Sequence, residues 1–265
     1  MYRFDEAAHV HYLDDKRLNG TTTVISETLS KPLTWWASSM ACAEFGWKDP
    51  KKNSEEECDR AAYEKLIEIS RMDLASYQRL LGKAYRAHAD NLDKAADKGT
   101  DLHDLVEQWI KSDMGINPPQ LFVDDRIRPF VEWAKRNVNK FLWAEACHYS
   151  KDLWVGGKSD MGYIDKDGKC VIGDIKSSRD AYLSHFIQAG AYHTQIAENG
   201  LWGDVDGFKF NPPNIDYYAI FPMGKKDFKE PEVDYRTAMY RDAFCSLLQV
   251  YKTKTAFDNK EAYRA

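Results

Sequence analysis

The spacing of hydrophobic residues changes near residue 140. Upstream, apolar side chains recur mostly every three or four positions, the period of an amphipathic helix; downstream, short apolar runs alternate with turn residues, as in strands. The helical pattern predicts one helix that begins at Pro32, a helical region from about 55 to 113, and helices at about 125–140, 183–199 and 235–256. The strand pattern predicts segments at 21–26, 142–150, 153–164, 169–177 and 214–223.

Capping residues mark several of these boundaries. Ser30 is placed to cap the first helix, and Ser54 with Glu57 forms a capping-box pattern that opens the long helical region. Gly200 is a candidate C-cap for the helix before it. Within the long region, we expect breaks near Ser70–Asp73 and at Gly82 or Gly99.

The order of these elements predicts an α/β fold in which a mixed central sheet is flanked by helices. Residues 1–95 are expected to form an N-terminal strand and helical subdomain packed on the core, and residues 96–265 the core with its C-terminal helix. With 43% hydrophobic and 13% aromatic residues, the chain can fill such a core as one structural domain.

Asp160, Asp174 and Lys176 form the most informative group of polar residues, within GGKSDMGYIDKDGKCVIGDIKSS (156–178). Side chains alternate along a strand, so Asp174 and Lys176 point the same way. If a three-residue loop with Gly168 in the left-handed conformation joins the two strands, residues that face each other across the hairpin have numbers that add up to 334. Asp160 then lies opposite Asp174. A two-residue loop would instead put Asp160 on the other face.

Charged residues that alternate on the open face of a hairpin are usually only solvated. The apolar Val171, Ile172 and Ile175 instead indicate a buried central strand around Asp174. A buried, unpaired carboxylate is costly and tends to bind a cation or a partner. Two carboxylates and an ammonium on one sheet face suit a hard divalent cation and an attacking water.

Two predicted helices carry further polar residues. His103 and Glu107 are four residues apart and so share one helix face, although a histidine on such a helix is more often a packed or capping residue than a metal ligand. On the 183–199 helix, Gln188 and Tyr192 share a face with His185. An amide and a phenol can hydrogen-bond phosphates or a base, or can be ordinary surface groups.

The order of these motifs resembles the RecB-type branch of the PD-(D/E)XK nuclease superfamily. The motifs are G-T-x-x-H on a helix, then G-x-x-D, D-x-K-S-S, and Q-x-x-x-Y on a helix. The likeness is to single-domain phage exonucleases and to CRISPR-associated RecB-like nucleases, and it covers roughly residues 20–223. It implies a restriction-endonuclease-like core and Mg²⁺ or Mn²⁺, one or two ions, as cofactor.

The resemblance also implies roles for individual residues. His103, Asp160 and Asp174 match the metal ligands, and the backbone carbonyl of Ile175 matches a further ligand. Lys176 matches the lysine that orients or activates the attacking water. In this branch a proline usually precedes the residue matched by Asp160, and here it does not.

Other positions match the family less specifically. Gln188 and Tyr192 match residues that support the lysine and the DNA backbone. Glu145 takes the place of a frequent family acid, and Glu107 is a further candidate ligand. Four residues are candidate DNA contacts: Ser177, Ser178, Trp35 and Trp36. For the tryptophans we expect core packing of one and partial exposure of the other; stacking on bases is the alternative.

Composition sets the remaining expectations. The five cysteines are scattered, which argues against a disulfide framework, a structural zinc site or an iron–sulfur cluster. No run approaches the apolar length that spans a bilayer, and the N-terminus lacks a signal-peptide pattern, so we expect an intracellular, cytoplasmic protein and no membrane partner. The formal net charge of −5 looks unfavourable for DNA binding, but phosphate binding depends on local patches and bound cations.

The sequence thus predicts a metal-dependent deoxyribonuclease, an exonuclease rather than a site-specific endonuclease, with DNA as partner. The resemblance suggests a place in phage-type recombination, repair or processing, with a recombinase or single-strand-binding protein as a potential partner and a phage-infected bacterium as the setting. Two alternatives stay open. One is a structure-specific or CRISPR-adaptation-like endonuclease, and the other is an inactive DNA-binding scaffold on a nuclease fold.

Overall fold

The computed structural model describes residues 1–29, 34–119, 122–202, 209–223 and 229–258, with every side chain in them except those of residues 92–100. Contacts within the chain separate it into two compact units. One comprises Met1–Ser30 with Gly99–Ala265, and the other comprises Lys31–Lys98. No helix in the described ranges has both the length and the apolar character needed to cross a bilayer.

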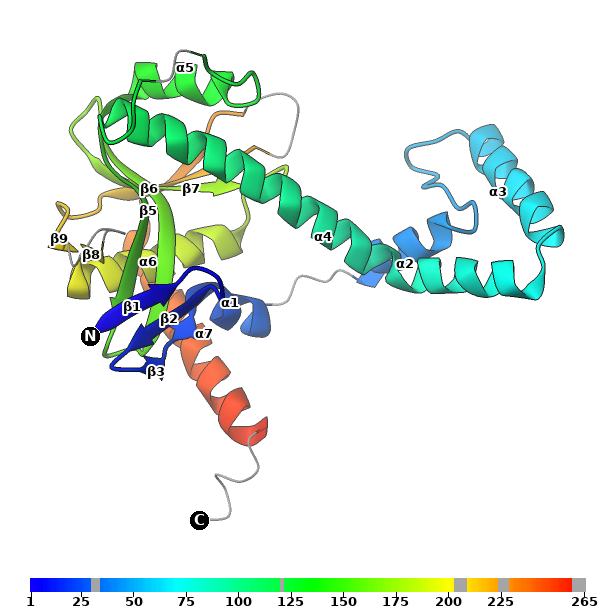
Figure 1. Ribbon diagram of the computed structural model, residues 1–265, viewed down its shortest axis with the longest axis horizontal. Helices are drawn as coiled ribbons and strands as arrows, with labels where there is room; N and C mark the ends of the chain where they lie inside the picture. Colours follow the sequence, from blue (N-terminus) through cyan, green and yellow to red (C-terminus); the bar gives the residue numbers. More distant parts are fainter. Residues whose placement is uncertain (30–33, 120–121, 203–208, 224–228, 259–265) are drawn as a thin grey trace. The chain divides into compact units, whose positions relative to one another are not determined.

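The larger unit is a mixed α/β structure built on one sheet (Figure 1). The strand order is β11 (Glu232–Asp234), β10 (Tyr217–Pro222), β7 (Cys170–Lys176), β6 (Val155–Asp165), β5 (Val138–Ser150), β8 (Leu201–Trp202) and β9 (Lys209–Phe210). β10 runs parallel to β7, whereas β5, β6 and β7 form an antiparallel meander. A two-residue strand, β4 (Asn19–Gly20), pairs in parallel with the start of β6. The predicted mixed sheet flanked by helices is therefore confirmed.

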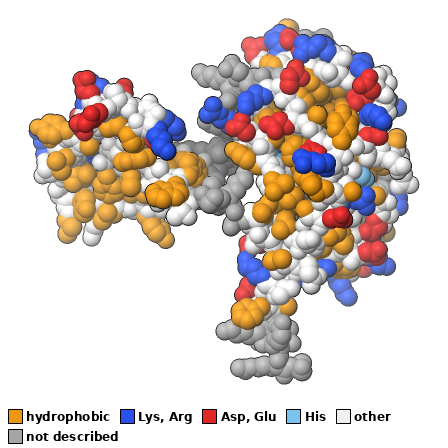
Figure 2. All heavy atoms as spheres, turned by 180° about the vertical axis from the view of Figure 1, so that it is seen from behind, with side chains coloured by type: hydrophobic (Ala, Val, Ile, Leu, Met, Phe, Trp, Pro, Cys, Tyr) orange, Lys and Arg blue, Asp and Glu red, His pale blue; other side chains and the backbone are white. Residues whose placement is uncertain are grey.

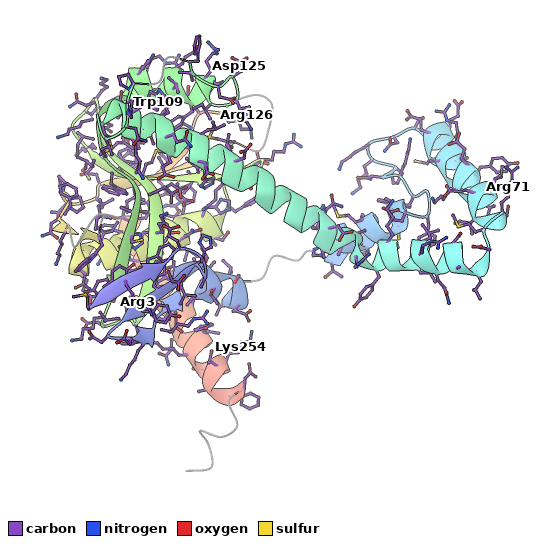
Figure 3. The ribbon with its side chains drawn as sticks, viewed as in Figure 1. Arg3, Arg71, Trp109, Asp125, Arg126 and Lys254 are labelled. Atoms are coloured by element: carbon purple, nitrogen blue, oxygen red, sulfur yellow. The ribbon has the colours of Figure 1, made fainter. Side chains whose placement is uncertain are left out.

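Helices cover both faces of this sheet because alternate strand residues are apolar on each side. On one face, residues of α6 (Leu183–Asn199), α7 (Thr237–Asp258) and α1 (Thr21–Thr28) form one buried apolar cluster with Ile172 and Ile220 of the sheet. On the other, the C-terminal part of α4 (Leu74–Asp113) and α5 (Arg128–Asn137) pack on Val171 and Phe221. Trp109 of α4, labelled in Figure 3, makes an edge-to-face contact with Phe130 of α5, with ring centroids 5.9 Å apart.

A small antiparallel sheet precedes the main one. It consists of β1 (Tyr2–Asp5), β2 (Val10–Leu13) and β3 (Lys16–Arg17). Tyr2 and Leu13 are buried with Leu18 and Cys147, so this sheet has its own apolar cluster against β5.

The prediction of a strand at 21–26 was wrong, because these residues form α1. Their β-branched side chains favour a strand by propensity, but Thr21, Val24 and Ile25 are buried at helical spacing. Val24 and Ile25 pack in the core that α6 and α7 share. Tertiary packing therefore overrides the local preference.

The long helical region is interrupted once among the described residues. α3 (Glu55–Ser70) ends where predicted, and the Ser54–Glu57 capping box is present, with Ser54 N donating to Glu57 Oε2 at 2.9 Å. The expected breaks at Gly82 and Gly99 are wrong, because α4 continues through both. A glycine inside a helix costs only about 1 kcal/mol relative to alanine, which need not end it. The predicted start at Ser30–Pro32 lies outside the described residues, and α2 spans Thr34–Ala43.

Other boundaries shift by a few residues. α5 ends at Asn137, so the end of the predicted 125–140 helix is the start of β5. The 183–199 helix is confirmed at its predicted bounds, and Gly200 caps it with a φ of 70°. α7 lies two residues further along the chain than predicted.

The Lys31–Lys98 unit consists of α2, α3 and the first part of α4. The buried apolar residues among its described side chains are few: Leu80, Ala84 and Ala87. Larger apolar side chains lie on its surface, as Figure 2 shows, and these include Trp35, Tyr63 and Tyr85.

Candidate metal centre

The β6–β7 hairpin has the predicted register. Met161 pairs with Gly173 and Ile164 with Cys170, so facing numbers sum to 334. Gly168 has a φ of 80°, the left-handed conformation that a three-residue loop requires. Continued by one residue, this register places Asp160 opposite Asp174. Asp160 Oδ2 there accepts a hydrogen bond from Ile175 N at 2.5 Å.

Asp174 and Lys176 lie together at the end of β7. The Asp174 side chain is only 1% exposed, and Lys176 Nζ lies 2.6 Å from its Oδ2. Apart from this ammonium, neither carboxylate oxygen of Asp174 has a hydrogen-bond donor among the described residues. Burial, partly offset by Lys176, raises the pKa of Asp174 to about 6. A buried carboxylate in this state fits a cation.

α4 brings His103 to the same place. His103 Nδ1 lies 3.6 Å from Asp160 Oδ1, which is an ion-pair distance rather than a hydrogen bond. Burial lowers the pKa of His103, but the Asp160 carboxylate outweighs it and the net pKa is raised. Burial likewise raises the pKa of Asp160, and here His103, Lys176 and the Ile175 N–H outweigh it, so the net pKa is lowered.

Glu145 completes a group of possible metal ligands. It lies between Ala144, which pairs with Met161, and Ala146, which pairs with Ser159, and so faces Asp160. One ligand atom from each of His103, Glu145 and Asp160 lies within 4.8 Å of the others. Burial and the neighbouring Asp160 raise the pKa of Glu145 to about 7.

The backbone of Glu145 is unusual. Its φ is 51°, in the left-handed region that a residue with a long side chain rarely adopts. Such conformations cost on the order of 1–3 kcal/mol and cluster at functional sites. The surrounding sheet thus holds a glutamate in an unfavourable conformation that directs it to Asp160.

Gln188 and Tyr192 support the site from α6. Gln188 Nε2 donates a hydrogen bond to the Tyr192 hydroxyl. Burial, together with Asp174 and Asp160, raises the pKa of Tyr192 well above its ordinary value, so the phenol stays protonated beside the carboxylates. His185 has a different role, because its Nδ1 accepts a hydrogen bond from Tyr182 N at the start of α6.

Several predicted residues are not brought into the group. Glu107 pairs with Lys111 on its own helix at 2.5 Å, although its charge helps to raise the pKa of Glu145. Ser177 is exposed, and Ser178 Oγ donates to the Asp180 carbonyl at 2.8 Å. A ligand role for the Ile175 carbonyl stays a prediction.

The two tryptophans belong to the Lys31–Lys98 unit. Trp35 is 85% exposed. Trp36 is 38% exposed, and its ring meets that of His88 edge-on, with ring centroids 4.9 Å apart. The expectation that one of them packs in a core is therefore wrong. α2 has no buried residue, which leaves both rings at least partly accessible.

Two features at the site were missed in the sequence. Lys158 Nζ lies 3.2 Å from Glu145 Oε2 and 3.5 Å from Glu6 Oε1. Its spacing from Asp160 was the available signal, since residues two apart on a strand share a face. The second is a buried network beneath Tyr192, in which Gln195 bonds His148 Nδ1 at 2.9 Å and Thr21 Oγ1 at 2.7 Å. No local signal joins these distant residues.

Comparison with known proteins does not identify this site. No protein-family model matches the chain, and no curated protein matches it significantly. The class of the site therefore has to be argued from its geometry.

Proposed function

We propose that the protein is a divalent-metal-dependent DNA exonuclease of the RecB-type PD-(D/E)XK branch. The observation that carries the proposal is the meeting of His103, Asp160 and Asp174 with Lys176 at one point of the sheet. These residues come from three elements, α4, β6 and β7, and the motif order anticipated their assembly. An antiparallel meander followed by a helix and a parallel strand is also consistent with a restriction-endonuclease-like core.

The donor set suits a divalent metal. The proposed ligands are His103, Glu145, Asp160 and Asp174; their carboxylates suit Mg²⁺, while the imidazole shifts the preference toward Mn²⁺. When bound, such a cation would neutralise the phosphate and lower the pKa of a coordinated water. Asp174, whose carboxylate has no hydrogen-bond donor other than Lys176 among the described residues, supports the presence of a cation in the working state.

Lys176 is the proposed positioning group for the nucleophile. Burial lowers its pKa, but Asp174 and Asp160 outweigh this and keep the ammonium protonated. It can therefore donate hydrogen bonds to the attacking water or to a phosphate oxygen, and it cannot act as a general base in this state. The protonated Tyr192, held by Gln188, offers a second donor on the same side of the sheet. The family resemblance implies a 5′-phosphate product.

A gel assay tests the proposal. Linear DNA labelled at either end and covalently closed circular DNA would be incubated with Mg²⁺, Mn²⁺ or EDTA. We expect metal-dependent loss of the linear DNA alone, and the labelled end that disappears first would give the polarity. Asp174→Ala should abolish the loss, whereas Asp242→Ala on the exposed face of α7 should not. Cleavage of the circle would favour an endonuclease, and intact DNA in every metal would favour a DNA-binding scaffold.

A further inference from the structure

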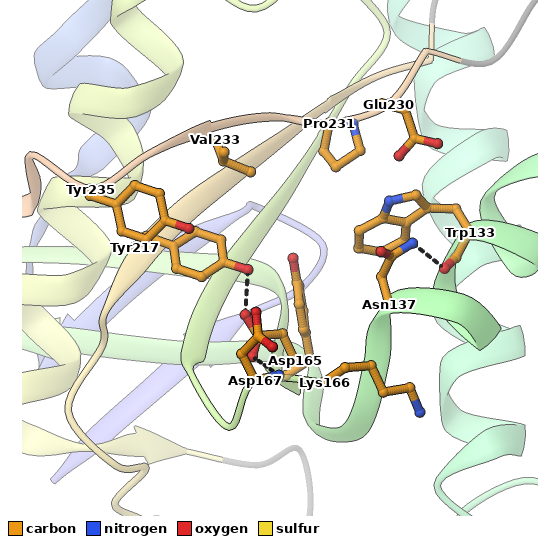
Figure 4. A pocket seen from close by; sticks show the side chains of 11 residues that line it. Trp133, Asn137, Asp165, Lys166, Asp167, Tyr217, Glu230, Pro231, Val233 and Tyr235 are labelled. Atoms are coloured by element: carbon orange, nitrogen blue, oxygen red, sulfur yellow. Dashed lines mark hydrogen bonds between the residues drawn. The ribbon is translucent and has the colours of Figure 1, made fainter.

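A pocket of about 280 Å³ lies in the larger unit, away from the candidate metal centre. It opens between the end of α5, the β6–β7 turn and β11 (Figure 4). Asp165, in its wall, follows Asp160 by five residues on β6, a distance of about 16 Å along a strand. Nothing in the proposed nuclease chemistry uses this pocket.

Aromatic rings form much of its wall. The pocket is lined by the rings of Trp133, Tyr163, Tyr217 and Tyr235, together with Pro231 and Val233. The rings of Tyr217 and Tyr235 lie side by side, with centroids 4.7 Å apart, and Trp133 lies across the pocket from them in Figure 4. Tyr235, at the rim, is 65% exposed.

The charges in the pocket are mostly negative. Three carboxylates line it, from Asp165, Asp167 and Glu230, against one ammonium, from Lys166. In Figure 4 the Lys166 ammonium points away from Asp165 and Tyr217. Glu230 has an exposed partner in Arg136 at 3.7 Å, and such surface pairs are weak.

The Asp165 carboxylate in the pocket wall is held in place by three hydrogen bonds. Its Oδ1 accepts hydrogen bonds from Asp167 N at 2.9 Å and Lys169 N at 2.8 Å, within the turn. Its Oδ2 accepts one from the Tyr217 hydroxyl at 2.8 Å. These donors hold the Asp165 carboxylate next to the Tyr217 ring.

We propose that this pocket binds an organic cation, an ammonium or a guanidinium group. Aromatic faces and carboxylates attract such cations together, whereas the same carboxylates repel phosphates. The volume is just below the usual range for small-molecule sites, which suits one amine or one basic side chain. The inference does not depend on the proposed nuclease activity.

The cation could be free or carried by a protein. Val233 of β11 lines the pocket together with Pro231 and Tyr235, the residues just before and just after this strand. Among the described strands, β11 pairs only with β10 and is the terminal strand of the sheet. An extended segment added to that edge would place alternate side chains on the same face.

Calorimetric titration of the full chain distinguishes these sources. The probes are tetramethylammonium, agmatine, an acetylated Thr-Val-Arg-Val-Thr amide, and the same peptide with Gln in place of Arg. Adenosine serves as a neutral aromatic probe. We expect heat with the cations and none with the Gln peptide or adenosine. Tighter binding of the Arg peptide than of agmatine would identify a protein-borne cation, and the reverse order a free one.

Tyr235→Leu and Glu230→Gln report on the pocket itself. Loss of one exposed cation–π contact should weaken binding of the cations about two- to fivefold. Tyr63→Leu is the matched control, because Tyr63 is also 65% exposed but belongs to the other unit. Far-ultraviolet circular dichroism would verify that each variant folds. Unchanged affinity in both pocket variants, equal binding of adenosine or the Gln peptide, or no heat with any cation at millimolar concentrations would overturn the proposal.

Discussion

At the scale of single residues, Asp174 has the most unusual environment at the candidate metal centre. Its carboxylate is almost fully buried and has Lys176 Nζ at 2.6 Å, with no other hydrogen-bond donor among the described residues. An ordinary structural carboxylate at this depth would accept several hydrogen bonds. The environment therefore disfavours the ionised form until a further cation is present.

Asp174→Asn should destabilise the metal-free protein by about 3 kcal/mol, because it leaves the buried Lys176 ammonium without the carboxylate that lies 2.6 Å from its Nζ. Mn²⁺ should raise the melting temperature of the wild type, since a ligand that binds the native state stabilises it, and should not raise that of the variant. Thermal unfolding in EDTA and in Mn²⁺ measures both effects. An equal Mn²⁺ shift in the two proteins would exclude Asp174 as a ligand.

Lys176→Ala should fold and bind DNA but lose most cleavage. By analogy with the loss of one donor to a developing negative charge, we expect a decrease of about 10²–10³ in rate. Single-turnover cleavage in Mn²⁺ and DNA binding in Ca²⁺ separate the two effects. Lys140→Ala, at an exposed lysine of β5, is the control. Unimpaired turnover in Lys176→Ala would remove this lysine from the mechanism.

At the scale of elements, the β6–β7 hairpin determines which side chains meet. Its loop sets the register, and a slip of one residue would move Asp160 to the opposite face. Gly168 permits this loop because it adopts a φ of 80°, and a Cβ there would meet nothing within 4 Å. The cost of replacing it is therefore conformational rather than steric.

Two glycine substitutions should have opposite effects. Gly168→Ala should destabilise the protein by about 1 kcal/mol, because an L-residue resists the left-handed conformation. Gly82→Ala, in the exposed part of α4 and also free of contacts, should stabilise it by about 0.5–1 kcal/mol. Urea unfolding of the three proteins tests this. The same sign for both variants would contradict the account.

α6 connects the site to a buried polar network. His148 is fully buried, and burial lowers its pKa to about 3, although its hydrogen bond to Gln195 opposes this. Gly157 on β6 makes room for it, because a Cβ there would lie 2.8 Å from the His148 ring and 2.9 Å from the Tyr192 ring. The network thus needs a neutral imidazole next to the tyrosine that supports the site.

This histidine should make the protein sensitive to mild acid. The unfolded chain protonates it near pH 6.5 while the folded protein does not, so stability is full above that pH and is lost as pH falls toward 3. At pH 5 the loss from His148 should be about 2 kcal/mol. Urea unfolding at pH 7 and pH 5 would measure it, and His148→Asn should lose about 2 kcal/mol less than the wild type between these pH values. An equal loss in both proteins would show that His148 is not the acid-sensitive group.

At the scale of the whole molecule, the chain combines an α/β unit that carries the candidate metal centre with a helical unit of mixed charge. The formal net charge of −5 means that the protein as a whole repels DNA. Binding must then come from local basic groups and from the bound cation. Such binding is electrostatic and therefore depends on salt.

DNA affinity in Ca²⁺ should fall at least about tenfold between 50 and 200 mM salt, as expected for two or more phosphate contacts. Fluorescence anisotropy with a short labelled duplex measures this. Affinity that does not change with salt would point to stacking on exposed aromatic rings such as Trp35 in place of phosphate contacts.

Local chemistry in the sequence determined most elements and part of the centre. Apolar patterning identified β5, β6, β7 and β10, the Ser54–Glu57 pair identified the start of α3, and Gly168 identified the loop that sets the hairpin register. These features depend on residues close in sequence, so propensity and periodicity suffice to predict them. The pairing of Asp160 with Asp174 followed from that register alone.

Only the tertiary structure decided the rest. It made 21–26 a helix because buried packing outweighed β-branched preference, and it turned Glu145 inward through a left-handed backbone. It also brought Lys158 to Glu145 and joined His148 to Gln195 and Thr21. Each of these depends on contacts between distant segments, whose energies have no counterpart in the local sequence pattern.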